Sequence, residues 1–368
     1  MADYRVLKLN DTVLGLHELS DLYHRKFHDP ATPQWERDVY EFIRQWIHSK
    51  DHIDVTTSGS TGKPKTISLK KKWMIHSALQ TCRFFGLNEQ TSALLCLPAA
   101  YIGGKMMIVR AFVSGMNLII VKPTSNPFAS LGDQVDFAAL TPHQLYESIE
   151  TITSKPVVKT LIIGGGAMDP ELEKRVEKLQ ARVYATYGMT ETSSHIALRA
   201  VNGINKQEEY LVVGDTKISS DERGCLVIDN PAIYSDVLIT NDLVEILDNK
   251  RFRYMGRADN VINSGGVKII PEEIEKIISP LRPERMILGA VPDKKLGEKV
   301  VLFVETLHLD TDQKHILTEK IKNKVKPYAV PRVIFYVDPF PETPGGKIDR
   351  KKLHKAIIDD KGNIKGNH

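Results

Sequence analysis

Short apolar runs alternate with amphipathic, helix-length segments through the first part of the chain. Runs typical of buried strands lie at residues 94–97, 118–121 and 161–163. Segment 35–46 places five apolar residues at helical spacing, and segment 104–113 has the length of a helix. This alternation predicts a layered α/β fold rather than an all-β fold or a helical bundle.

A glycine triplet at 164–166 directly follows the strand-like run at 161–163. A helix is then predicted from Pro170 to about Leu179, because Asp169 is a favourable N-cap and proline is favourable at the first helical position. Bare backbone between a strand and a helix lies where α/β sheets usually bind ligands. A tight turn is the alternative interpretation of the triplet.

After about residue 205 the pattern changes to short strands and turns. The strand-like runs predict an antiparallel-sheet subdomain, and they lie at 226–228, 237–240, 243–246 and 252–254.

From residue 259 onward a smaller unit again mixes helices and strands. A helix is predicted at 271–278, and two strands at 300–304 and 333–337 flank a Lys-rich helix near 313–325. We therefore predict a large N-terminal domain of layered α/β subdomains over 1–258, with the small antiparallel-sheet subdomain at about 205–258, and a small α+β C-terminal domain over 259–368.

Composition narrows the class of protein. The chain has 368 residues, 42% of them hydrophobic, and a net charge of +4 with both signs interspersed, which gives no argument for nucleic acid or a membrane surface as a partner. Three cysteines without a C-x-x-C pair indicate a reducing compartment, and we expect no membrane insertion because no run approaches 18 apolar residues. The N-terminal residues lack a signal-peptide pattern, so we expect a cytoplasmic protein.

Residues 56–65 form a run rich in hydroxyl groups and glycine that ends in Lys63-Pro64-Lys65. Glycine lets the backbone approach an anion closely, while hydroxyls, amides and lysines donate to phosphoryl oxygens. A Walker A loop is excluded, because the glycines are only three apart and Pro64 follows Lys63. A flexible linker is the alternative, but β-branched and apolar residues on both sides favour a phosphate-binding loop between two strands.

Together with this run, six further segments resemble the adenylate-forming superfamily of acyl-CoA synthetases, aryl-CoA ligases, luciferases and peptide-synthetase adenylation domains. The segments follow the family's order and span nearly the whole chain; they are 57–65, 97–104, 164–166, 187–191, 240–242, 254–259 and 343–350. The family usually has a long region before the phosphate loop, so we expect an N-terminally shortened member with a mobile C-terminal domain.

The resemblance implies a reaction in two steps. A carboxylate attacks the α-phosphorus of ATP with the help of Mg²⁺, and CoA then takes the acyl group from the adenylate. The resemblance assigns Thr190 to the α-phosphate, Glu191 to Mg²⁺ and Lys347 to the charge that develops at the carboxylate. It assigns the phosphate loop to Thr57, Ser58, Gly59, Ser60, Thr61, Gly62 and Lys65.

The same resemblance places the nucleoside. Asp242 and Arg257 would hold the ribose, although Asp242 could also be a residue of a hairpin turn. The family usually has glycine where this chain has Asn241. The adenine slot and its surroundings would be formed by Gly164, Gly165, Gly166, Tyr187, Gly188 and Met189.

Two further roles follow from the resemblance. Asp259 would be the hinge about which the C-terminal domain rotates between the half-reactions. The rotation would bring Ser264, Gly265 and Gly266 to the pantetheine thiol of CoA.

Within the superfamily, residues 97–105 and 262–266 most resemble the o-succinylbenzoyl-CoA synthetases of menaquinone biosynthesis, although Tyr101 replaces a common histidine and Val267-Lys268 a common Glu-Asn. The small-molecule acid would carry a second carboxylate that needs a cationic partner. Lys105 ranks first, because it follows two glycines in an otherwise apolar helix, while a structural role stays open for Arg110, five residues further along the same predicted helix. The predicted substrate-binding residues are Tyr101, Gly103, Lys105, His195 and Arg199.

Two alternatives stay open at this point. The protein could pass its acyl group to a carrier-protein thiol instead of CoA, or it could be a nucleotide-binding regulator without activity. The presence of both Glu191 and Lys347 argues against the regulator. A homodimer is also left open.

Overall fold

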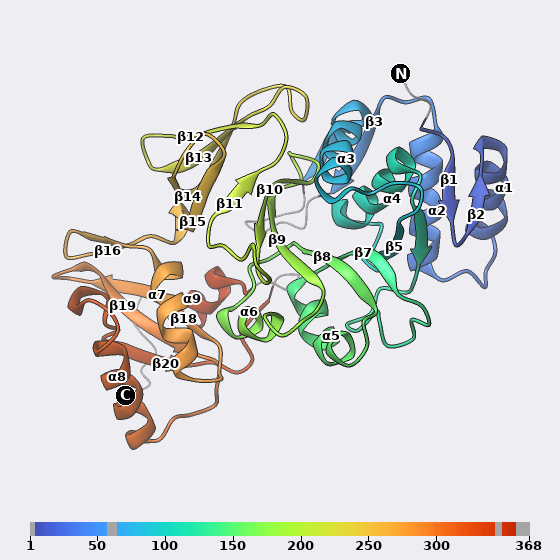
Figure 1. The fold of residues 1–368 in the computed structure, drawn as a ribbon. Coiled ribbons are helices and arrows are strands. Elements are labelled where there is room, and N and C mark those ends of the chain that lie inside the picture. The colour runs from blue at the N-terminus through green and yellow to red at the C-terminus, as the bar shows by residue number, and fades with distance from the viewer. Residues whose placement is uncertain (1–3, 57–64, 343–347, 358–368) are drawn as a thin grey trace.

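The computed structural model describes residues 4–56, 65–342 and 348–357. Within these ranges thirteen strands form one large sheet, in the order β12-β13-β14-β15-β11-β10-β9-β8-β7-β5-β6-β1-β2 (Figure 1). Its parallel part consists of β1 (Leu7–Leu9), β6 (Asn117–Ile120), β5 (Ser92–Leu95), β7 (Val135–Leu140), β8 (Val158–Ile163) and β9 (Arg182–Gly188), and β2 (Thr12–Leu14) pairs antiparallel with β1.

The other part of the sheet is antiparallel. It consists of β10 (His195–Ala200), β11 (Tyr210–Val212), β12 (Lys217–Ser220), β13 (Cys225–Asp229), β14 (Leu238–Ile246) and β15 (Arg251–Arg257). Because β11 pairs with both β10 and β15, the β-rich subdomain continues the large sheet.

Helices cover both faces of the parallel part. Alternate strand residues face opposite sides, so Ala93 and Leu95 join one core while Leu94 joins the other. The first core includes α1 (Leu16–Phe27), α2 (Gln34–Ile47), α3 (Lys71–Phe85) and α4 (Ile102–Ser114), and the second includes α5 (Pro142–Ser154) and α6 (Pro170–Val176).

A separate hairpin flanks the predicted phosphate loop. Strands β3 (His52–Thr56) and β4 (Thr66–Lys70) pair antiparallel, with Thr56 opposite Thr66. The prediction of two strands around this run is confirmed, while residues 57–64 lie outside the described part of the chain.

A smaller sheet begins after β15. Its strands are β16 (Ile262–Ser264), β17 (Val267–Ile269), β18 (Met286–Asp293), β19 (Gly297–Val304) and β20 (Val333–Tyr336), in the order β17-β16-β19-β18 with β20 parallel to β19. Its helices are α7 (Pro271–Ile278), α8 (Thr311–Lys322) and α9 (Arg350–Ile357), and short 3₁₀ turns are η1 (Ala258–Asn260), η2 (Ser279–Leu281) and η3 (Pro327–Ala329).

The α/β architecture predicted from the sequence is confirmed, and the change of sheet falls between Arg257 and Ile262. The division into domains at 258/259 stays a prediction. One element was predicted wrongly: the runs at 237–240 and 243–246 form the single strand β14, because a register shift between Leu243 and Val244 lets its pairing with β15 continue. Asn241 and Asp242 therefore lie inside a strand and not in a hairpin turn.

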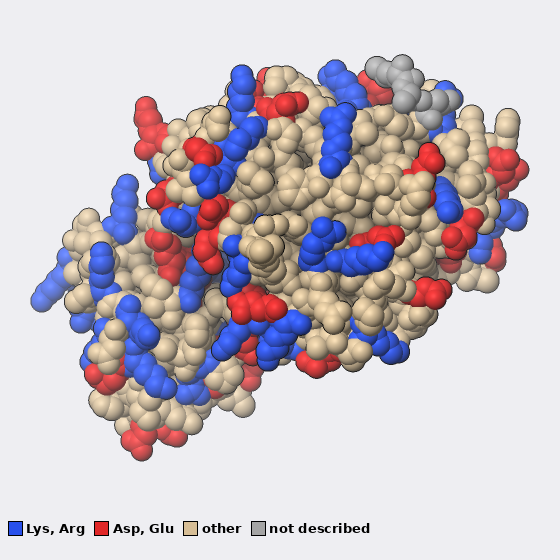
Figure 2. Space-filling view, viewed as in Figure 1, with Lys and Arg blue, Asp and Glu red and all other residues tan. Residues whose placement is uncertain are grey.

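Basic and acidic side chains are interspersed over the face shown in Figure 2. Within the described ranges, no helix combines the length and the apolar character needed to span a membrane.

One buried side chain ties the end of α6 to the start of β9. The Asn202 Nδ2 donates to the carbonyls of Val176, Leu179 and Ala181, and its Oδ1 accepts from the Val183 amide at 2.9 Å. Asparagine is needed here because it offers donors and an acceptor from one compact group.

We predict that Asn202→Ala lowers the free energy of unfolding by about 2 to 4 kcal/mol, since it leaves buried backbone groups without partners. Urea unfolding followed by circular dichroism measures the loss. Asn249→Ala, at an exposed asparagine, is the matched control and should change stability by less than about 0.5 kcal/mol. Equal stabilities of the two variants would show that the Asn202 contacts contribute nothing.

Candidate active site

The predicted adenine-binding residues lie where β8 and β9 end. Gly164 directly follows β8, and its amide donates to the Leu140 carbonyl. Gly165 has a φ of +82°, which favours glycine. Gly188 ends β9 so close to the next turn that an added Cβ would lie 2.4 Å from the Ser194 carbonyl oxygen. The structure thus brings two stretches of bare backbone to one edge of the sheet.

The side chain of Tyr187 is fixed beside this edge. Its ring packs edge-on against Phe252, with ring centroids 5.2 Å apart, and lies near Tyr210 and Tyr254. Its hydroxyl donates to Asp242 Oδ2 at 2.6 Å. Burial and the neighbouring charge of Asp242 raise the pKa of Tyr187 well above its ordinary value, so the hydroxyl stays a donor.

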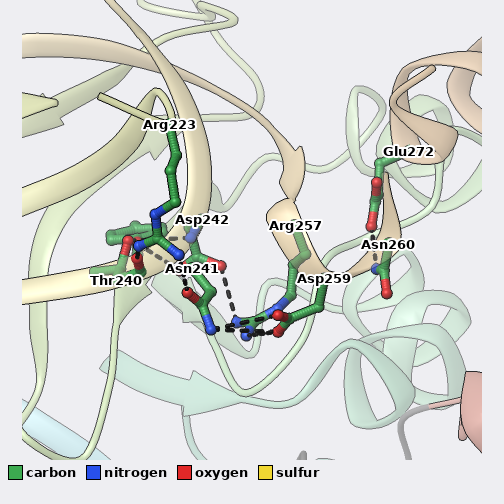
Figure 3. Close-up of polar contacts among 9 residues, drawn as sticks. Arg223, Thr240, Asn241, Asp242, Arg257, Asp259, Asn260 and Glu272 are labelled. Atoms are coloured by element: carbon green, nitrogen blue, oxygen red, sulfur yellow. Dashed lines mark hydrogen bonds and ion pairs between the residues drawn. The ribbon is translucent and has the colours of Figure 1, made fainter. Parts of the chain in front are cut away.

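Asp242 is the centre of the site (Figure 3). It lies opposite Arg257 in the β14–β15 pair, and the Arg257 Nη1 donates to its Oδ1 at 3.0 Å. The Asp242 side chain is 13% exposed. Since each carboxylate oxygen has two lone pairs and accepts one of these bonds, both oxygens can accept further donors.

The Arg257 side chain forms ion pairs with two aspartates, Asp242 and Asp259. Its Nη2 donates to Asp259 Oδ2 at 3.1 Å, and Asp259 lies in η1, where the large sheet ends. Burial alone would lower the pKa of Arg257, but Asp242 and Asp259 together raise it above its ordinary value. Arg257 therefore stays a cation between the predicted ribose ligand and the predicted hinge.

A tight turn after β9 presents Thr190 and Glu191. The buried Thr192 stabilises this turn, because its Oγ1 accepts a hydrogen bond from the Met189 amide and donates one to the Ser194 carbonyl. Ser193 has a positive φ of 62° within this turn. Among the described residues no cluster of three potential metal ligands occurs. The role of Glu191 towards Mg²⁺ stays a prediction, and a single carboxylate beside phosphate oxygens and water is a donor set that suits this ion.

Behind this turn lies a buried cation. The Arg110 side chain, from α4, donates through Nη2 to Ser194 Oγ at 2.6 Å, and its Nε is buried with no hydrogen-bond partner in the described structure. Among the described residues it forms no ion pair with an acidic side chain. Burial lowers the pKa of Arg110 to about 10, which still leaves it charged at neutral pH.

His195 lies beside this arginine. Its Nε2 is 3.2 Å from Thr81 Oγ1, and its Nδ1 is 3.5 Å from Ser194 Oγ. Burial and the charge of Arg110 hold the pKa of His195 well below its ordinary value. The ring is therefore neutral near pH 7.

The other predicted substrate-binding residues make their contacts away from His195 and Arg110. The Lys105 Nζ lies 4.9 Å from the centre of the Phe42 ring, on the side of α4 that meets α2. Arg199 forms an ion pair with Glu173 and lies over the Tyr210 ring. Tyr101 is 48% exposed and precedes the first turn of α4, which contains Gly103. The structure therefore brings His195 together with Arg110 rather than with Lys105 or Arg199.

The predicted CoA-contacting residues form the β16–β17 hairpin. Gly265 and Gly266 have φ values of 60° and 83°, and Ser264 is buried. Ser264 and Gly265 line a cavity of about 200 Å³, together with Tyr328 and Arg332.

Seven of the predicted site residues belong to segments outside the described part of the chain. Lys347 and the phosphate-loop residues Thr57, Ser58, Gly59, Ser60, Thr61 and Gly62 lie outside the described residues. Lys65 is described and exposed just before β4.

The sequence pattern does not indicate Thr192 or Ser194, and it leaves a structural role open for Arg110. For Arg110 a signal existed, because a charged residue within an apolar helix needs a partner. For Thr192 and Ser194 no such signal exists. Their contacts form only when the turn between β9 and β10 folds, and the sequence pattern does not predict that turn.

A family model of AMP-binding enzymes matches residues 46–227. A 2-succinylbenzoate–CoA ligase from Bacillus cereus is 27% identical over an alignment of 341 residues, which covers 82% of this chain and 69% of the relative. The 2-succinylbenzoate–CoA ligase from Listeria monocytogenes serovar 1/2a is 26% identical over 85% of this chain and 72% of its own length.

The similar solved structures are also of AMP-forming acid–CoA ligases. An o-succinylbenzoate CoA synthetase from Bacillus subtilis, in complex with an acyl-adenylate intermediate, has a TM-score of 0.74 over 96% of each chain, and at 16% identity this likeness shows the fold alone. An acyl-CoA synthetase (AMP-forming)/AMP-acid ligase II-like protein from Dyadobacter fermentans is 33% identical, with a TM-score of 0.61 over 93% of this chain and 98% of that chain. With this identity over nearly its whole length, the chain belongs to the family of AMP-binding enzymes that includes the AMP-forming acyl-CoA synthetases.

Proposed function

We propose that this protein activates a carboxylic acid with ATP and then transfers the acyl group to CoA. In the first step the carboxylate oxygen bonds to the α-phosphorus and pyrophosphate leaves. In the second the CoA thiol, as it loses its proton, attacks the acyl carbon and AMP leaves. Both steps balance without an oxidant or a reductant.

The observation that carries this proposal is the arrangement around Asp242. Its carboxylate can only accept hydrogen bonds, it is held by Tyr187 and Arg257, and both oxygens keep lone pairs that suit the two ribose hydroxyls. The bare backbone at Gly164–Gly166 and the Tyr187 ring lie at the same edge and suit a flat base.

Mg²⁺, when bound beside Glu191, would neutralise phosphate charge and orient the leaving group. The protein's own contribution is to hold the carboxylate and the α-phosphorus in line and to exclude water. Thr190 and Glu191 lie on the turn that the hydrogen bonds of Thr192 stabilise, so the backbone at both residues is positioned before nucleotide binds. Lys65, Lys347 and the phosphate loop would supply positive charge.

The acid that we propose is o-succinylbenzoate, and menaquinone biosynthesis is the pathway. The curated relatives named above support it, and so does the buried Arg110. A buried cation without an acidic partner is costly unless an anion meets it, and a second carboxylate of the substrate is such an anion. We rank Arg110 above Lys105, since Arg110 lies beside Ser194 and His195, whereas Lys105 already lies over Phe42.

The proposed transfer to CoA requires a movement of residues 259–368 relative to 1–258. Asp259 lies in η1 between the two sheets. A rotation there would have to break contacts between α7 and β15, among them the one between the Lys276 Nζ and the Tyr254 carbonyl. The β16–β17 hairpin with its adjacent cavity would then face the thiol. The cytoplasmic location stays a prediction, and homodimerisation stays open.

Pyrophosphate exchange into ATP, measured over a panel of aryl and acyl acids, tests the function. We expect exchange with o-succinylbenzoate at least about tenfold faster than with benzoate, which lacks the second carboxylate. Thioester formation should follow with CoA. Thioester formation only with a carrier protein would favour the alternative ligase, and no exchange with any acid would exclude an active adenylating enzyme.

Two variants of α4 test the substrate partner. Arg110→Met should raise the KM for o-succinylbenzoate by about 10- to 100-fold, the scale of one charge-assisted contact, and leave the KM for ATP within about twofold. The matched Lys105→Met should change neither KM by more than about twofold. Thermal unfolding distinguishes a loss of substrate binding from a loss of folding. Arg110→Met replaces a buried charge that has no acidic partner among the described residues, so we expect it not to lower the Tm. The reverse result, a raised KM only in Lys105→Met, would restore Lys105 as the partner.

A further inference from the structure

The side chain of Asn241 contacts the residue at which we place the hinge. Its Nδ2 lies 3.4 Å and 3.5 Å from the two carboxylate oxygens of Asp259, across the junction between β14 and η1 (Figure 3). This contact depends on the side chain of Asn241, because among the described residues only its amide nitrogen reaches the Asp259 carboxylate from β14.

A second contact sets the orientation of this amide. The Arg223 Nη1 donates to Asn241 Oδ1 at 3.0 Å, and its Nη2 donates to the Thr240 carbonyl at 3.1 Å. Arginine can only donate and an ionised aspartate can only accept, so the amide must turn its oxygen to Arg223 and its nitrogen to Asp259. The direction of the contact with Asp259 therefore follows from the chemistry of its neighbours.

Arg223 is itself held in place. Its Nε donates to Asp221 Oδ2 at 2.9 Å, while Asp221 Oδ1 accepts from the amides of Arg223 and Cys225. These bonds close the turn between β12 and β13. The chain of contacts thus runs from a rigid hairpin through Asn241 to Asp259.

Asp259 receives donors from two strands of the large sheet. Arg257, at the end of β15, donates to the same Oδ2 that lies 3.4 Å from the Asn241 amide. The Asp259 side chain is 50% exposed, so the groups around it can exchange for water when the backbone turns. The contacts with Asn241 are near the upper limit of hydrogen-bond length, which suits a contact that must break during each catalytic cycle.

We propose that Asn241 is a positioning residue that, with Arg223 behind it, stabilises the described orientation of the C-terminal unit by holding the Asp259 carboxylate. This inference rests on the proposed function for the roles of the two orientations. It adds that this chain shifts the balance between them through the contact of Asn241 with Asp259.

Two variants test the proposal. Asn241→Ala removes the amide, and Asn241→Asp keeps an acceptor for Arg223 but places a second carboxylate against Asp259. We expect Asn241→Ala to change the ratio of adenylation to thioesterification rates by about threefold to tenfold, the scale of a hydrogen bond to a charged group. Asn241→Asp should change it in the same direction and at least as far. Asn249→Ala is the matched control and should leave the ratio unchanged.

The orientation itself is measured independently of activity. Cysteines introduced at the exposed Glu147 of α5 and Lys320 of α8 can carry a donor and an acceptor dye, since the native cysteines Cys82, Cys96 and Cys225 are buried. In the nucleotide-free protein, Asn241→Ala should reduce the population with the main wild-type energy transfer by at least about twofold.

The outcomes separate this inference from the proposed function. A shifted energy-transfer population with no pyrophosphate exchange in the wild type would support the role of Asn241 while excluding the adenylating activity. Exchange in the wild type, with unchanged energy transfer and an unchanged ratio of half-reactions in both variants, would overturn the inference alone. Equal slowing of both half-reactions with unchanged energy transfer would make Asn241 merely structural.

Discussion

The structure around the candidate site depends on one largely buried carboxylate. Asp242 is 13% exposed, and its charge is tolerated because Tyr187 and Arg257 donate to separate oxygens. These donors come from β9 and β15, so one side chain of β14 fixes three strands relative to one another. Removing either donor would lower the stability of the folded protein, because a largely buried charge would lose one of its two partners. Each of its oxygens still has a lone pair that can accept a further donor.

This carboxylate also connects the proposed nucleotide site with the junction between the two sheets. Arg257 bridges Asp242 and Asp259, and Asn241, the neighbour of Asp242, contacts Asp259 as well. A nucleotide that places hydroxyl donors on Asp242 would reduce the share of negative charge available to Arg257. The cation would then interact more strongly with Asp259, so the occupancy of the site and the state of the junction would be linked.

Much of the fold could be predicted from local patterns. Asp169 and Pro170 mark the start of α6 correctly, with the Asp169 Oδ1 accepting from the Leu172 amide, and the proline-led helix at 271–278 forms as expected. Local rules failed at β14, because a bulged strand and two short strands with a turn have the same hydrophobic pattern. The contact between Tyr187 and Asp242 spans 55 positions and becomes visible only when the sheet is assembled. The surroundings of Arg110 also become visible only in the fold. The sequence shows a charge in an apolar helix, and the structure shows that its Nε is buried without a hydrogen-bond partner among the described residues.

The role of Asp242 is tested most directly by comparing ATP with its 2′-deoxy and 3′-deoxy forms in wild type, Asp242→Asn and Tyr187→Phe. We predict that wild type disfavours the deoxy forms by about 10- to 100-fold in kcat/KM, that Tyr187→Phe keeps most of this discrimination, and that Asp242→Asn loses at least about fivefold of it. If the asparagine variant discriminates as strongly as wild type, Asp242 does not accept the ribose hydroxyls and the site has been assigned to the wrong group.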